Sequence, residues 1–154
     1  MLLRRLVAGV AAIVLVLEAA VLVFVHIVLG RTTANQSMSI AGSDPDVMSK
    51  ATYALGAGMG AFLLLCAVLL AVAAVRDLAP GRPARVVLIV ATVTHGVLGA
   101  LAVGPAGWGV FAAVMLIFCL LALSLTLYAV RDEGRGAGEG KGEGPVVEFR
   151  PTGP

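Results

Sequence analysis

A few residues able to take part in acid–base, thiol or metal chemistry interrupt the long apolar stretches of this sequence. They are Glu18, His26, Cys66, His95 and Cys119. A carboxyl group or an imidazole in apolar surroundings can hold or transfer a proton. A reactive cysteine needs a polar, accessible setting that stabilises its thiolate. The elements that carry these residues decide which of these chemistries is feasible.

The sequence around the two cysteines and His26 gives little indication of a functional site. Cys66 and Cys119 lie among Leu, Ala and Val, with no CxxC or other close metal-ligand spacing. We therefore expect no zinc site, no disulfide framework and no cofactor. His26 lies near the end of the first apolar stretch, where an amphipathic ring can reach interfacial water. Because no third ligand follows at a suitable spacing, we interpret it as an interfacial histidine rather than a metal ligand.

The composition indicates the kind of element that carries these residues. The chain has 154 residues, of which 60% are hydrophobic and 13% charged, whereas a soluble domain is about 25% charged. Four segments are long enough to cross a bilayer, which takes roughly 20 helical residues. They are residues 6–29, 45–75, 86–103 and 108–130. The sequence predicts an all-α polytopic membrane protein, whose domain 1–130 is an antiparallel bundle of four transmembrane helices.

The first segment could also be read as a signal peptide, because two arginines precede its apolar stretch. That apolar stretch is about twice the usual length, however, and it contains Glu18. We therefore expect the first segment to be retained as a transmembrane helix.

The basic residues that flank these segments predict their orientation. Arg31 and Lys50 lie on one side of the predicted membrane. Seven arginines lie on the other side, together with the two termini: Arg4, Arg5, Arg76, Arg82, Arg85, Arg131 and Arg135. Cytoplasmic loops carry an excess of Lys and Arg, so both termini are expected in the cytoplasm. The scattered basic residues form no clustered basic face, which argues against nucleic acid as a partner.

Two segments outside the apolar stretches have a clear pattern. Before the second stretch, Ser43 or Asp44 can cap a helix, Pro45 fits its first turn and Asp46 favours the positive end of its dipole. Beyond Val130 the sequence becomes Gly-rich with charges of both signs. Such sequence buries too little apolar surface to offset the entropy of ordering. We expect residues 131–154 to be a disordered cytoplasmic tail.

Glu18 and His95 are predicted to lie at similar depth in the bundle. At about 1.5 Å per helical residue, Glu18 lies ~18 Å from Leu6, and His95 lies ~14 Å from Val86. Both predicted helices run in the same direction across the membrane, so the two side chains can form a hydrogen bond if the helices approach. We expect a neutral polar pair. A structural link between helices, a proton- or ligand-handling site and a contact with a partner protein all remain open.

Small residues suggest where helices pack closely. Gly56 and Gly60 have GxxxG spacing, and in the third segment small residues recur every four positions, at Thr92, Gly96, Ala100 and Gly104. Such stripes let helix backbones approach, within one bundle or between subunits. Aromatic residues mark the ends of the fourth segment, where Trp108 and Tyr128 are expected to be interfacial anchors.

The opening sequence "RRLVAGVAAIVLVLEAAVLV" and the four-span plan resemble the small four-helix integral membrane proteins of actinobacteria. The resemblance covers roughly residues 4–130, implies a bacterial plasma-membrane protein and assigns no catalytic or binding residue. Because the sequence offers no catalytic constellation, we expect a non-catalytic accessory subunit or structural component. Its partners would be the lipid bilayer and either further copies of itself or a larger membrane complex. The alternative is a small oligomeric proton-linked transporter or channel that uses Glu18 and His95.

Overall fold

In the computed structural model, the chain is all-helical. The structure describes residues 2–35, 42, 44–77, 80–102 and 107–139, and for residues 130–139 it describes the backbone alone. The helices are α1 (Leu2–Asn35), α2 (Pro45–Arg76), α3 (Arg82–Ala102) and α4 (Gly107–Glu139). Within these residues, four helices are long and apolar enough to cross a membrane, which confirms the all-α class and the predicted set of four helices.

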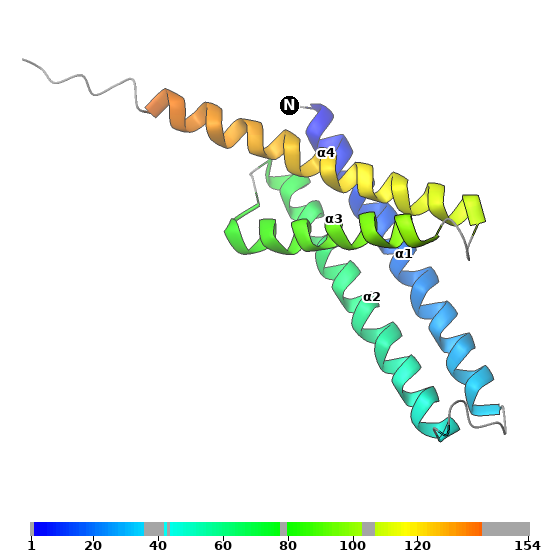
Figure 1. Ribbon diagram of the computed structural model, residues 1–154. Helices are drawn as coiled ribbons and strands as arrows, with labels where there is room; N and C mark the ends of the chain where they lie inside the picture. The colour runs from blue at the N-terminus through cyan, green and yellow to red at the C-terminus, as the bar shows by residue number, and fades with distance from the viewer. Residues whose placement is uncertain (1, 36–41, 43, 78–79, 103–106, 140–154) are drawn as a thin grey trace, which may run out of the picture.

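The helices associate as two pairs. α1 packs along α2, α3 packs along α4, and the second pair crosses the first over the part that contains the start of α1 (Figure 1). The other part of the α1–α2 pair continues beyond the crossing. Most of the contact between the two pairs is that of α4 with α1, while α2 and α3 touch only slightly. The molecule is therefore two crossed helix pairs.

α2 has well-defined ends. Its N-cap is Asp44, whose side chain accepts a hydrogen bond from the Asp46 amide at 2.9 Å, and Pro45 occupies the first helical position. This confirms the predicted helix start and selects Asp44 over Ser43. At the other end, Asp77 takes the left-handed conformation with φ 53° and terminates the helix. A non-glycine residue tolerates this conformation best when it is Asn or Asp.

Most helix boundaries differ from the predicted spans, and α1 extends beyond its predicted span 6–29 at both ends. α3 begins at Arg82 rather than residue 86, because Pro83 lacks only an amide that the first helical turn leaves unbonded anyway. α4 continues to Glu139, so the structure gives a helical backbone to residues 131–139, where the sequence predicts a disordered tail. Once a helix exists, each further residue adds a hydrogen bond without a new nucleation cost. Residues 140–154, the rest of the predicted tail, lie outside the described residues.

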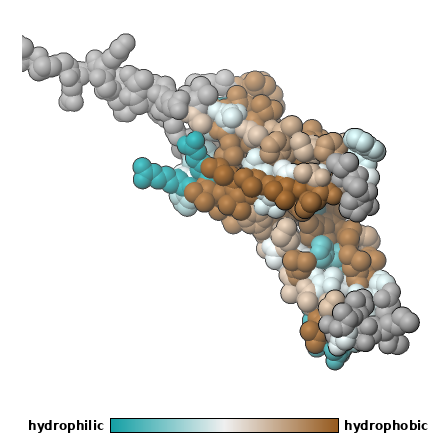
Figure 2. Space-filling model, in the orientation of Figure 1, coloured by the Kyte–Doolittle hydropathy of each residue, from teal (hydrophilic) through white to brown (hydrophobic). Residues whose placement is uncertain are grey.

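The core of the first pair consists of small side chains. α1 contributes mainly alanines, and α2 adds leucines and Cys66; the buried set is Ala8, Ala11, Ala12, Leu15, Ala19, Leu63, Cys66, Ala67, Leu70, Ala73 and Ala74. The outward faces are also apolar, and hydrophobic residues cover much of the visible surface in Figure 2. The helices therefore expose apolar side chains on the faces that do not pack against each other.

Candidate functional site

The structure brings Glu18 of α1 and His95 of α3 together where the two helix pairs cross. His95 Nε2 lies 3.2 Å from Oε1 and 3.1 Å from Oε2 of Glu18. The other ring nitrogen, Nδ1, lies 2.7 Å from the backbone oxygen of Ala91, one turn earlier in α3. Both nitrogens of the imidazole are therefore engaged, and the ring orientation is fixed.

These contacts determine how many protons the pair holds. A carbonyl oxygen only accepts hydrogen bonds, so Nδ1 must carry a proton and donate it to Ala91. The contact between Nε2 and the Glu18 carboxyl then needs one further proton, either on the carboxyl or on Nε2. In both arrangements the net charge of the pair is zero, which is the state with the smallest burial cost. The geometry thus favours a pair that shares one proton.

The two members of the pair differ in exposure. The His95 side chain is 3% exposed and the Glu18 side chain 22%. Glu18 lines a cavity of about 450 Å³ between α1 and α4. Val14, Leu17 and Val21 line it from the same helix, and five residues of α4 between Gly109 and Ile117 line the opposite side. Among the described residues that line this cavity, Glu18 is the only titratable one, and the others are apolar.

In α3, the buried face differs from the predicted stripe of small residues. The buried residues are Leu88, Ala91, His95 and Gly99. Of the predicted set, Thr92 and Gly96 are partly buried and Ala100 is exposed, while Gly104 lies outside the described residues. Ala100 therefore does not pack within this chain. The buried positions Ala91, His95 and Gly99 lie one residue before the predicted stripe, which stays a prediction for packing within the bundle or between subunits.

Gly99 and Gly96 nevertheless mark the contact between α3 and α4. A Cβ at Gly99 would lie 2.9 Å from Met115 Sδ, and one at Gly96 would lie 3.2 Å from the Phe118 ring. Gly96 thus lies at a helix contact, as its place in the predicted stripe implies.

Gly56 and Gly60 face α1 at the far end of the first pair. A Cβ at Gly60 would lie 2.5 Å from Val23 Cγ2, and one at Gly56 would overlap the Cβ of His26. His26 itself points its Nδ1 at the Leu22 backbone oxygen, 2.8 Å away. Here His26 packs against a helix backbone, and its ring makes a local hydrogen bond. Both glycines are required where α1 and α2 approach closely.

Sequence reasoning did not find a second polar cluster, which lies at the opposite end of the α1–α2 pair. Arg4 donates to both carboxylate oxygens of Asp77 at 2.7 and 2.5 Å, and its guanidinium lies 5.8 Å from the centre of the Tyr128 ring. Tyr128 donates its hydroxyl proton to the Ala73 oxygen at 2.9 Å, and Arg5 donates to the Ala74 oxygen. Elements α1, α2 and α4 therefore meet at this cluster.

Tyr128, which the sequence predicts as an interfacial anchor, is only 2% exposed. Trp108, by contrast, is 75% exposed and stacks edge-on against Phe111. The signal that could have found the cluster was the matching position of Arg4 and Asp77 at facing ends of adjacent antiparallel segments.

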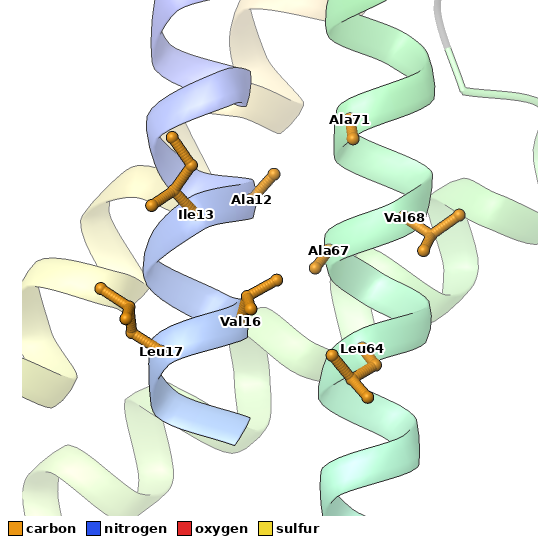
Figure 3. Close-up of a pocket in the computed structure, with 8 residues that line it drawn as sticks. All are labelled: Ala12, Ile13, Val16, Leu17, Leu64, Ala67, Val68 and Ala71. Carbon is orange, nitrogen blue, oxygen red and sulfur yellow. The ribbon is translucent and has the colours of Figure 1, made fainter. Parts of the chain in front are cut away.

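The remaining candidates for chemistry do not come together. Cys66 is buried and Cys119 exposed, and neither is in a disulfide. Among the described residues, no group of three or more His, Cys, Asp or Glu side chains is placed to hold a metal ion. A second cavity of about 340 Å³ lies between α1 and α2, where Ala12 and Val16 face Ala67 (Figure 3). Its lining is wholly apolar, so it offers no group for catalysis.

Comparison of the chain with protein-family models, with curated proteins and with solved structures gives no match. The inference about function therefore depends on the geometry described above.

Proposed function

We propose that the protein is a non-catalytic integral membrane protein of the bacterial plasma membrane. Its four helices cross the bilayer in alternating directions, with both termini in the cytoplasm. The observation that carries this proposal is the exposure of large apolar side chains on every helix. In α1, for example, Ile13, Leu17 and Phe24 are 64%, 61% and 66% exposed. Water disfavours such a surface, whereas lipid tails solvate it, and helices satisfy their own backbone hydrogen bonds there.

Cysteine labelling of intact cells tests this topology. In a background that lacks Cys66 and Cys119, we expect an impermeant maleimide to modify Ser39→Cys and to spare Gly138→Cys until the membrane is permeabilised. Labelling of Gly138→Cys in intact cells would contradict the proposed orientation. Recovery of the chain in the soluble fraction would contradict membrane insertion itself.

Within the membrane, we propose a role in assembly, as an accessory subunit or as a homo-oligomer. The polar side chains at the helix crossings support this role, because they are occupied in joining helices of this chain. The exposed apolar faces remain for contact with lipid or with other membrane helices. Native mass spectrometry from a mild detergent tests this role: a defined oligomer or a stoichiometric partner supports it. A monomer with lipid alone, also after in-membrane crosslinking, would contradict it.

One observation favours a second candidate, a small oligomeric proton-linked transporter or channel. Glu18 both shares a proton with His95 and borders the cavity between α1 and α4. A carboxyl group with these two properties can exchange a proton with a ligand in the cavity. In reconstituted vesicles, this candidate predicts proton flux that Glu18→Gln abolishes while the fold is retained. The assembly role predicts no flux for either protein.

A further inference from the structure

The cavity between α1 and α4 combines the size of a small-molecule site with a titratable residue in its lining. Its volume of about 450 Å³ lies within the roughly 300–1,000 Å³ typical of small-molecule sites. Eight of its nine lining residues are apolar, and the ninth is Glu18. Small-molecule sites commonly combine an apolar lining with a single polar group that fixes orientation. The cavity of about 340 Å³ between Ala12 and Ala67 has the apolar lining alone, so nothing there would orient a ligand.

The charge of the lining selects the ligand. A carboxyl group is complementary to a cation, and the apolar walls from Val14 to Val21 and from Gly109 to Ile117 are complementary to a hydrophobic body. We propose that this cavity binds a lipophilic organic cation, an amine whose ammonium group pairs with the Glu18 carboxylate. The proposal rests on the membrane location proposed above, and on no particular oligomeric state.

Binding of such a cation is expected to release one proton. In the free protein, Glu18 and His95 share one proton on the contact between Nε2 and the carboxyl, and the pair is neutral. When the ammonium group approaches, that proton leaves to solvent, and two N–H groups of the ammonium take its place by donating to the carboxylate and to Nε2. His95 stays neutral with its proton on Nδ1. The net charge of the occupied site is again zero, which avoids an uncompensated charge within the membrane.

This exchange predicts the direction of the pH dependence. The charged or titratable group that faces Glu18 is His95 of α3, while the α4 residues that line the cavity are apolar and no α2 residue lines it. A cation therefore competes with the proton held by this one pair. Affinity for the amine is expected to fall as the pH is lowered and protons compete more strongly.

The experiment is calorimetric titration of the full chain in lipid nanodiscs with 1-adamantylamine, and with 1-adamantanol as its uncharged counterpart. We expect saturable binding of the amine, at least tenfold weaker binding of the alcohol, and release of one proton per amine, measured in two buffers of different ionisation enthalpy. Glu18→Gln should weaken amine binding at least tenfold. Equal uptake of both compounds, insensitive to Glu18→Gln, would be partitioning into lipid and would overturn the proposal.

A second pair of variants keeps the test independent of the polar pair. Ala113 lines the cavity and Ala112 does not, although both are exposed on α4. We expect Ala113→Phe to fill the cavity and abolish amine binding, while Ala112→Phe binds as the wild type does. If Ala113→Phe instead changes only the oligomeric state, the cavity is a protein interface and the proposal is wrong. If Gly138→Cys is labelled in intact cells while amine binding persists, the proposed orientation is wrong and the cation site stands.

Discussion

The interface between α1 and α2 and the interface between the two helix pairs are built in different ways. The first is apolar along most of its length. Its small residues, alanine and glycine, let side chains of one helix pack against the backbone of the other. The second adds two polar contacts to its apolar core, Glu18 with His95 and Tyr128 with Ala73, and the cavity that Glu18 lines opens between α1 and α4. An interface of close-packed small residues has one optimal geometry. An interface that includes polar contacts can also leave space for a ligand, as in the cation site proposed between the pairs.

The largest expected effect comes from the apolar interface. Gly60→Ala places a Cβ 2.5 Å from Val23 Cγ2, whereas Gly58→Ala places its Cβ in open space on the same helix. Overpacking of this kind costs about 1–3 kcal/mol. Gly58→Ala should be neutral or stabilise by up to about 1 kcal/mol, because alanine favours the helix. Thermal unfolding in bicelles measures both variants. Equal stability would show that α1 and α2 do not approach this closely.

An intermediate effect is expected at the contact between Tyr128 and Ala73. Tyr128→Phe keeps the buried ring but removes the hydroxyl that donates to the Ala73 oxygen, a loss of about 1 kcal/mol. Tyr53→Phe is the matched control, since the structure gives its hydroxyl no hydrogen bond among the described residues while its ring packs on Gly30. The free energy of unfolding should fall for the first variant and change by less than about 0.5 kcal/mol for the second. The reverse order would place Tyr128 outside the interface.

A smaller effect is expected at Glu18. Glu18→Gln retains the shape and can donate to His95 Nε2, so we expect near-normal stability. Glu18→Leu leaves Nε2 without its partner, and a neutral hydrogen bond between membrane helices contributes about 0.6 kcal/mol on average and ~1.7 kcal/mol at most. A loss well above that range for Glu18→Leu would show that the pair carries full charges. Chemical unfolding of the two variants beside the wild type gives the measurement.

Much of the helical plan followed from hydropathy, because twenty apolar residues leave few alternatives to a helix. The start of α2 at Pro45 followed from the capping pattern. The approach of Glu18 to His95 could be anticipated from their equal depth along two segments that run the same way. Each of these inferences uses distance along one chain segment and a local chemical preference.

The arrangement of the helices relative to one another did not follow in the same way. Where most faces of a helix are apolar, periodicity does not show which face is buried, and the sequence therefore did not indicate that Ala91 and His95 are more buried than Thr92 and Gly96. The position of Tyr128 near the end of the fourth segment predicts an anchor at the membrane–water interface, but does not show that the ring is buried between helices. Hydropathy indicates where a membrane-spanning segment could end, but not where the helix itself ends. The end of α4 at Glu139, beyond Val130, could therefore not be predicted from hydropathy.

The central claim is that Glu18 and His95 join the two helix pairs through one shared proton. Solid-state NMR of the chain in lipid, with ¹³C in the Glu18 carboxyl and ¹⁵N in His95, measures this contact directly. The account predicts strong dipolar dephasing between the Glu18 carboxyl carbon and Nε2, consistent with the 3.1 and 3.2 Å contacts, and a protonated Nδ1. Absence of dephasing, or an Nε2 signal that Glu18→Leu leaves unchanged, would contradict it.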